Sequence, residues 1–266
     1  MKNNYKNLLI LFMSVMMVAS CSVKEDRRVC PSWLRLDLHP CLDVTGDVLV
    51  TAWNDEGNLR YFRDKVHVLD YAEYYDKDVP RGLTHISVYT PLKSNIEEGH
   101  RITIPYGQDF DEFYAYSNYV NCDEEFYVDT VYLHKQFANV YIKIEKSEDE
   151  NYPYEFFVES NVCGIDLFTL LPIEGKFMYD IPIDRTDMGI FSLPRQFEDS
   201  DALKLNIRHK GVTIESINLA EVVRTMNYSW DAENLEDIYI GVDYAEAEVS
   251  ISISDWGEGQ KEDVIL

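Results

Sequence analysis

The chain has 266 residues, and its 24 lysines and arginines face 48 aspartates and glutamates, a formal net charge of −24 at pH 7. This balance excludes nucleic acid as a partner, because binding to phosphates needs a surplus of basic side chains. The 13% aromatic content favours a well-packed β protein, and the length suffices for one large domain or two of ordinary size.

The N-terminus has the pattern of an export signal. Two lysines precede a largely apolar run, Leu8–Val18, which is too short to span a bilayer as a helix. Small residues ending in Ser20 then precede Cys21. The pattern predicts a lipoprotein signal peptide over residues 1–20, cleavage between Ser20 and Cys21, and acylation of the Cys21 thiol. Each buried methylene contributes about 0.8 kcal/mol, so two or three acyl chains anchor a domain firmly.

A short charged segment follows the predicted lipid anchor. Lys24, Glu25 and Asp26 resemble the tag that sends many Bacteroidetes lipoproteins to the outer face of the outer membrane. These three residues are therefore a candidate export tag, within a lipidated tether over residues 21–30. The sequence predicts a lipid-anchored, surface-exposed protein of the outer membrane.

Apolar and polar residues alternate along most of the mature chain, as is typical of half-buried strands. Alternation begins over residues 34–38, and a turn at Thr45-Gly46-Asp47 precedes a second strand over 48–53. The clearest alternation covers residues 245–254. Shorter candidate strands lie at 86–88, 102–104, 126–128, 140–144, 203–207 and 212–214. Helical spacing occurs at Leu219, Val222 and Val223, which predicts one short helix, and residues 66–75 predict an irregular segment.

Short strands separated by turns predict an all-β sandwich architecture rather than a parallel α/β sheet. No period of 20 to 50 residues recurs, which excludes a solenoid or propeller. The acidic stretch over residues 121–125 is the best candidate junction, because a new series of strands begins near Leu133. We therefore expect an N-terminal domain over residues 31–132 and a C-terminal domain over 133–266.

Four cysteines follow Cys21, at Cys30, Cys41, Cys122 and Cys163. Exported cysteines can pair, and four of them permit three connectivities, among which the sequence does not choose. Neither a CxxC spacing nor a histidine cluster accompanies them, so we expect no zinc site.

Catalytic and calcium-binding patterns are also missing. The acids Asp109, Asp111 and Glu112, or those at 123–125, could be imagined as a carboxylate pair or a calcium site. A calcium loop counted from Asp109 would place Tyr114 where the glycine belongs and Val120 where the closing glutamate belongs. Runs of acids usually mark solvated loops. No GxSxG, HExxH or GxxxxGK[ST] motif occurs. The sequence therefore predicts a protein that is not an enzyme and holds no metal or cofactor.

Several segments in order resemble the FimB-type family of fimbrial anchor lipoproteins of Bacteroidetes. They are residues 26–31, Leu34–Leu38, Gly164–Phe177, Leu193–Gln196, Leu203–Ile207, Tyr228–Trp230, Leu235–Ile238, Val242–Tyr244 and Asp255–Trp256. The resemblance implies two tandem transthyretin-like Greek-key β-sandwich domains. It also implies membership of the type V fimbrial system, in which a lipoprotein holds the fibre base in the outer membrane and affects fibre length. Asn227 replaces the family's usual glycine, and residues 61–92 are unusually rich in Tyr and Asp, so the partner pilin is left open.

The resemblance leads to the hypothesis that strand-mediated contact with the adjacent pilin anchors the fibre, with the donor or acceptor role undecided. The C-terminal residues 264–266 are apolar and would serve assembly or dock on their own domain. The alternative function is that of a surface glycan-binding lipoprotein, since exported β-sandwiches use aromatic rings to bind sugars. The tryptophans that would present such rings are Trp33, Trp53, Trp230 and Trp256.

Overall fold

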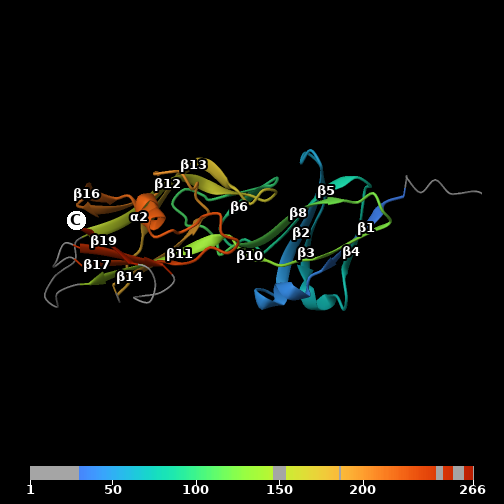
Figure 1. Ribbon diagram of the computed structural model, residues 1–266, viewed down its shortest axis with the longest axis horizontal. Helices are drawn as coiled ribbons and strands as arrows, with labels where there is room; N and C mark the ends of the chain where they lie inside the picture. The colour runs from blue at the N-terminus through green and yellow to red at the C-terminus, as the bar shows by residue number, and fades with distance from the viewer. Residues whose placement is uncertain (1–29, 146–153, 186, 244–247, 254–260, 266) are drawn as a thin grey trace, which may run out of the picture.

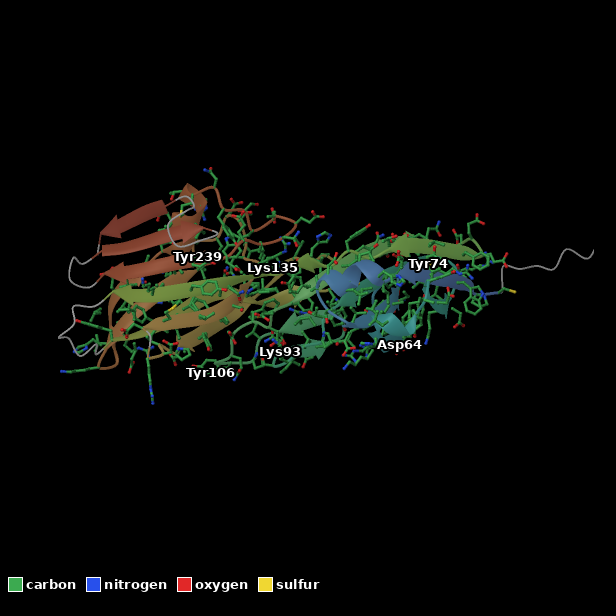
Figure 2. The ribbon with its side chains drawn as sticks, turned by 90° about the horizontal axis from the view of Figure 1, so that it is seen from below. Asp64, Tyr74, Lys93, Tyr106, Lys135 and Tyr239 are labelled. Carbon is green, nitrogen blue, oxygen red and sulfur yellow. The ribbon has the colours of Figure 1, made fainter. Side chains whose placement is uncertain are left out.

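The computed structural model describes residues 30–145, 154–185, 187–243, 248–253 and 261–265. These residues form two lobes that lie end to end along the long axis, and the described chain begins at the outer end of the N-terminal lobe (Figure 1). A view turned by 90° shows the same elongated arrangement (Figure 2). Nearly all regular structure is β-strand, arranged in four sheets, so the predicted all-β sandwich fold is confirmed.

The N-terminal lobe is a sandwich of two sheets. The three-stranded sheet has the order β4-β1-β9 and contains β1 (Ser32–Asp37), β4 (Tyr75–Val79) and β9 (Phe126–Thr130). The five-stranded sheet has the order β10-β8-β5-β2-β3 and contains β2 (Asp47–Asn54), β3 (Arg60–His67), β5 (Leu83–Tyr89), β8 (Tyr114–Asn121) and β10 (His134–Lys135). Short 3-10 helices follow β1 and β3, namely η2 (His39–Asp43) and η3 (Val68–Asp70).

Alternation along β1 explains how this sandwich closes. Leu34 and Leu36 are fully buried and join a core cluster with apolar residues of β2 and β5. Trp33 and Arg35 lie on the opposite face of the strand, which is exposed. β1 pairs in antiparallel fashion with β4 and in parallel with β9. One face of the small sheet therefore covers the core and the other faces outward.

The C-terminal lobe is a second sandwich. Its five-stranded sheet has the order β14-β11-β17-β18-β19 and contains β11 (Phe137–Glu145), β14 (Met188–Pro194), β17 (Ile238–Asp243), β18 (Glu248–Ile253) and β19 (Lys261–Ile265). The facing sheet has the order β16-β15-β12-β7-β6, with β13 on the opposite side of β12 from β15. Its strands are β6 (Ile96–Glu98), β7 (Arg101–Thr103), β12 (Tyr154–Asp166), β13 (Pro172–Ile181), β15 (Lys204–His209) and β16 (Val212–Ile217).

The predicted short helix is present as α2 (Leu219–Thr225). The Asn218 side chain caps it by accepting a hydrogen bond of 3.2 Å from the backbone amide of Glu221. Leu219 and Val223 are buried in the core of the C-terminal lobe. The helical spacing of three apolar residues was therefore enough to locate this helix, because its apolar face packs on the core of the sandwich.

Strands cross between the lobes in both directions. The β6–β7 hairpin is inserted between two strands of the N-terminal sandwich, yet β7 pairs with β12 through Ile102 and Ile165. Conversely, β10 lies past residue 132 and pairs with β8. The acidic stretch at residues 121–125 connects β8 to β9 within the N-terminal lobe. The boundary at 132/133 stays a prediction, and any cut there would separate paired strands.

A third hydrophobic cluster joins the two lobes. It combines Tyr89 and Phe113 of the N-terminal lobe with Phe137, Ile165 and Leu167 of the C-terminal lobe, all buried. Hydrogen bonds reinforce the contact, because the Ser87 hydroxyl donates to the Leu167 carbonyl over 3.1 Å. Because the lobes share apolar packing and paired strands, we expect them to move as one rigid unit rather than as two domains on a flexible linker.

Most predicted strands are found, but their partners were not predicted. β1, β2, β5, β7, β9, β11, β15 and β16 cover the candidate segments of the first 214 residues. β18 occupies residues 248–253 of the predicted strand 245–254, whose other residues lie outside the described part of the chain. The long β12–β13 hairpin was recognised only as a family motif, because two register shifts interrupt its alternation.

Candidate functional site

The edge strands β13 and β14 belong to the C-terminal lobe, which is the lobe farther from the N-terminus (Figure 1). Among the described strands, β13 pairs only with β12, and β14 pairs only with β11. Each therefore forms the edge of its sheet, and residues 182–187 connect the two edges. An edge strand presents backbone N–H and C=O groups that a further strand can pair with.

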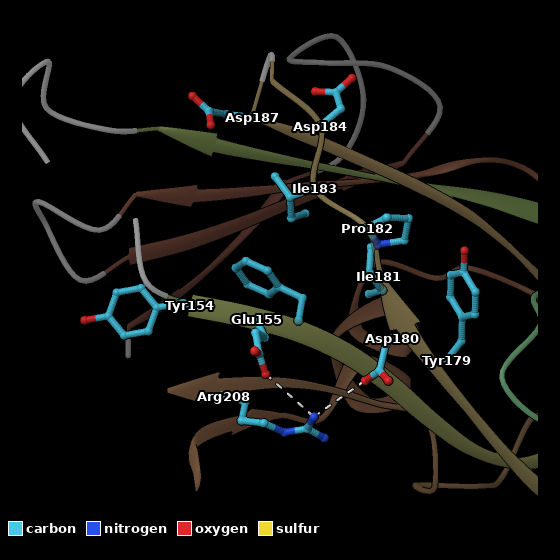
Figure 3. A pocket seen from close by; sticks show the side chains of 11 residues that line it. Tyr154, Glu155, Tyr179, Asp180, Ile181, Pro182, Ile183, Asp184, Asp187 and Arg208 are labelled. Carbon is cyan, nitrogen blue, oxygen red and sulfur yellow. Dashed lines mark ion pairs between the residues drawn. The ribbon is translucent and has the colours of Figure 1, made fainter. Parts of the chain in front are cut away.

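A cavity of about 670 Å³ lies beside the β13 edge (Figure 3). Phe156 and Ile181 form a buried apolar part of its wall. Pro182 and Ile183 continue that wall along the connection toward β14, and the Tyr154 ring lies at one side. The cavity thus offers apolar contact beside the β13 edge, and strand addition combines such contact with a free strand edge.

Charged side chains surround the cavity, and most of them are acidic. The Arg208 guanidinium lies 3.8 Å from the Glu155 carboxylate and 3.6 Å from that of Asp180 (Figure 3). Asp184 and Asp187 also line the cavity. Among the described residues that line the cavity, Arg208 is basic and Glu155, Asp180, Asp184 and Asp187 are acidic.

The edge of β14 is capped at two of its residues. The Met188 amide donates to the Asp184 carboxylate over 3.2 Å, and the Met188 carbonyl accepts from the Asp184 amide over 2.8 Å. At Ser192, the carbonyl accepts from the Phe110 amide, and the amide donates to the Asp109 carboxylate. Backbone groups of alternate residues in a strand point to the same side. Ile190 therefore directs its amide outward between the two caps, and its side chain is exposed.

Gly189 keeps β14 close to the cavity wall. A Cβ at this position would lie 2.7 Å from the Ile183 side chain and 2.8 Å from that of Ile181. These separations are shorter than van der Waals contact, so only glycine permits this approach of the two edges.

Other edges are less accessible or differently placed. In the N-terminal lobe, the Lys77 ammonium and the Tyr75 hydroxyl both contact the Asp64 carboxylate, which bridges β4 to β3. β16 forms the other edge of its sheet and exposes Val212 and Ile214. β19 pairs with β18 in antiparallel fashion. The C-terminal segment thus pairs with its own domain and forms the edge of that sheet, so docking and assembly both stay predictions.

The predicted lipidation site and export tag lie outside the described residues, namely Ser20, Cys21, Lys24, Glu25 and Asp26. None of the helices in the described part of the chain is long and apolar enough to cross a membrane.

All four described cysteines are free thiols. Cys41 is buried, and burial raises the pKa of its thiol to about 12. Burial also raises the pKa of the Cys122 thiol. Cys30 is exposed, and the Cys163 sulfur lies 3.7 Å from the Glu174 carbonyl. The three connectivities left open by the sequence are therefore absent among these residues.

The acids at 109–112 act as structural groups. The Asp111 carboxylate accepts hydrogen bonds from the backbone amides of Lys93, Ser94 and Asn95. Burial raises its pKa, but these bonds outweigh burial and hold the pKa below its usual value. The Glu112 carboxylate lies 3.5 Å from the Lys93 ammonium. In the part of the chain that the structure describes, no three His, Cys, Asp or Glu side chains converge as metal ligands would.

Comparisons with known proteins concern the fold. No known family model matches the sequence, and no curated protein matches it. Among solved structures, the fold is similar to that of the fimbrial anchor protein Mfa2 from Porphyromonas gingivalis, with a TM-score of 0.58 and 13% identity over 85% of this chain and 98% of that chain. A candidate adhesin from Bacteroides ovatus gives a TM-score of 0.61 and 12% identity over 88% of this chain and 96% of that chain.

A candidate polysaccharide-binding protein from Bacteroides thetaiotaomicron gives a TM-score of 0.58 and 11% identity, covering 87% of this chain and 100% of that chain. All three likenesses extend over both lobes, since each covers at least 85% of this chain. The two-lobed β architecture is thus shared with these three solved structures.

Proposed function

We propose that this protein is a non-enzymatic lipoprotein of the outer membrane that is anchored through Cys21, exposed on the cell surface, and holds the base of a fimbria. The observation that carries the proposal is the placement of its two ends. The described chain begins at one end of the long axis, and the open edge with its cavity lies in the opposite lobe. The likeness in fold to the fimbrial anchor Mfa2 supports the same function.

In this proposal the neighbouring pilin contributes a strand to the open side of the C-terminal lobe. Its backbone pairs at Ile190, and alternate side chains enter the cavity beside Phe156 and Ile181. Because the anchor occupies the last subunit of the fibre, its supply relative to pilin would set fibre length.

The test replaces one backbone donor. Ile190→Pro removes the outward amide without removing a bond to β11, since proline is tolerated where an edge N–H faces solvent. Ile190→Thr is the matched control, because it keeps the amide and changes only the side chain. Tagged protein is recovered from detergent-solubilised outer membrane, and the fimbrial subunit bound to it is quantified by mass spectrometry. We expect the proline variant to lose about tenfold of the pilin and the threonine variant to keep most of it.

Equal pilin recovery with both variants would remove the β14 edge from the mechanism, and absence of pilin with the native protein would contradict the anchor function. A separate variant, Cys21→Ala, tests the lipid anchor by cell fractionation. It should release the protein into soluble fractions and cause cells to shed fibres. Membrane retention of this variant would argue against lipidation.

A second candidate, glycan binding at the cell surface, is favoured by one groove on the C-terminal lobe. Tyr106 is 85% exposed at a turn (Figure 2) and lines a cavity of about 590 Å³ together with Asn161, Lys176 and Lys204. An exposed ring with polar neighbours can stack on a sugar and bond its hydroxyls. Of the four tryptophans that the sequence offered for sugar binding, Trp53 and Trp230 are buried, Trp33 is exposed, and Trp256 lies outside the described residues.

The two functions are separated by a glycan array probed with the native protein and Tyr106→Ala. Binding that is lost in the variant would establish the glycan function. Fimbrial subunit genes beside the gene for this protein would favour the anchor, and a glycan-transporter pair would favour glycan binding.

A further inference from the structure

The outer face of the three-stranded sheet carries apolar side chains that are exposed over about half of their surface. Trp33, Phe126 and Val128 are 44%, 46% and 54% exposed. Trp33 and Phe126 are register partners in the parallel pair of β1 and β9, and Val128 is the partner of Arg35. We call Trp33, Phe126 and Val128 the aromatic patch. Both rings stand at the first or second residue of their strands, so they lie together at one end of the sheet.

The chain leaves the lobe beside this patch. The Arg81 guanidinium donates to the Cys30 carbonyl over 2.8 Å and also to the Asp123 carbonyl. The Trp33 amide donates to the Glu125 carbonyl over 2.9 Å. The exit point at Cys30 is thereby held against the β8–β9 turn, three residues from Trp33. In Figure 1 this point is the outer end of the long axis.

The length of the preceding segment limits how far the patch can lie from a lipid attached at Cys21. Nine peptide steps separate Cys21 from Cys30, and a fully extended chain advances at most about 3.6 Å per residue. The exit point therefore lies within about 32 Å of the lipidated cysteine. A tether of this length lets the patch reach a bilayer that holds the lipid, and the patch lies at the opposite end of the molecule from the C-terminal lobe.

We propose that the aromatic patch rests on the lipid headgroup region of the membrane and orients the N-terminal lobe there. This inference rests on the proposed lipid anchor at Cys21. Tryptophan is enriched where proteins meet the membrane surface, because its ring buries apolar area while its N–H stays wet. If the lobe did not rest on the membrane, the rings of Trp33 and Phe126 would stay exposed to water.

The charges around the patch specify the kind of lipid surface. The Arg35 guanidinium lies over the Phe126 ring at 4.5 Å and bonds the Asp76 carboxylate at 3.0 Å. Asp78 is the register partner of Trp33 on its other side. The patch therefore has no excess positive charge, and apolar contact drives its binding. It should prefer zwitterionic lipids to anionic ones, unlike a basic membrane-binding surface.

The experiment uses the full-length lipidated protein, purified from membranes and reconstituted in phosphatidylcholine vesicles whose acyl chains are brominated near the headgroup. Flotation first measures attachment, and quenching of tryptophan fluorescence then measures contact. Trp33→Phe keeps an aromatic ring but removes the probe. We expect the native protein to float and to be quenched, and the variant to float equally while losing quenching by about threefold or more.

A second measurement uses protein with Cys21→Ala, which lacks the lipid. Its weak binding to phosphatidylcholine vesicles should fall about tenfold in Trp33→Ser/Phe126→Ser. Binding to these vesicles should stay unchanged in the control variant Leu59→Ser, because Leu59 is exposed on the same lobe but lies outside the patch. Replacing a third of the lipid by phosphatidylglycerol should weaken binding. Flotation without Trp33-dependent quenching would overturn this inference and leave the anchor intact. Failure of the native protein to float would overturn both.

Discussion

The phenyl ring of Phe168 lies nearly flat against the imidazole of His85, with ring centroids 4.0 Å apart and an interplanar angle of 24°. The His100 imidazole stacks on the same phenyl ring at 4.3 Å and 14°. Asp166 holds His100 in place through a contact of 2.7 Å. Phe168 follows β12 of the C-terminal lobe, whereas His85 belongs to β5 of the N-terminal lobe. This sandwich of three rings therefore locks the lobes together.

Removing the Phe168 ring should weaken the contact between the two lobes. Phe168→Ala deletes the contacts with both imidazoles and with Trp53, whose ring centroid is 5.7 Å away. Phe168 is partly buried, so we expect a loss of about 2 to 3 kcal/mol in the free energy of unfolding. Chemical denaturation measures it, with Leu59→Ala as an exposed control. A loss no larger than that of the control would mean that the stacked rings do not stabilise the junction.

Stability should depend on pH through His85. Burial lowers the pKa of this imidazole from 6.5 to about 4. Between these values the unfolded chain binds the proton and the folded protein does not, so stability is complete above about pH 6.5 and falls as the pH drops toward 4. The loss approaches about 3 kcal/mol. His85→Phe keeps a ring but cannot titrate, so its unfolding free energy should fall less. Parallel pH profiles of the two proteins would exclude His85 as the cause.

The shared sheet between the lobes depends on one glycine. A Cβ on Gly164 would lie 2.0 Å from the Ile102 carbonyl oxygen, a backbone atom of β7 that cannot rotate away. Gly164→Ala should therefore separate β7 from β12 and cost about 3 kcal/mol or more.

Gly46→Ala is the matched control, because its new methyl group would meet only the His67 ring at 3.4 Å. Its effect should stay within about 0.5 kcal/mol. Thermal melting and hydrogen exchange of the β7 amides compare the two variants. Equal melting would show that β7 and β12 tolerate separation.

Substituting the candidate export tag should move the protein to the other face of the outer membrane without removing its lipid. Replacing Lys24, Glu25 and Asp26 together by alanine should leave Cys21 acylated, and the protein should stay on the inner side of the outer membrane. Protease treatment of whole cells measures exposure. Equal digestion of the variant and the native protein would contradict a targeting role for these residues.

The sequence alone located nine of the nineteen described strands by their local pattern. Alternation is a local property, because burial of one sheet face imposes period two on any half-buried strand. Leu34 and Leu36 could therefore be placed in a core, and the spacing of Leu219, Val222 and Val223 located the single predicted helix. The predictions of an export signal and of lipidation at Cys21 are equally local, since such a pattern is recognised from consecutive residues.

The tertiary structure decided which strands pair and which edges stay open. The β6–β7 hairpin joins the sheet of the other lobe, because Ile102 meets Ile165 across more than sixty residues of chain. Trp33 and Trp53 occupy similar alternating segments, yet only Trp53 is covered, by Phe168 from the C-terminal lobe. Such differences depend on what packs against a strand from elsewhere in the chain, and no local pattern records that contact.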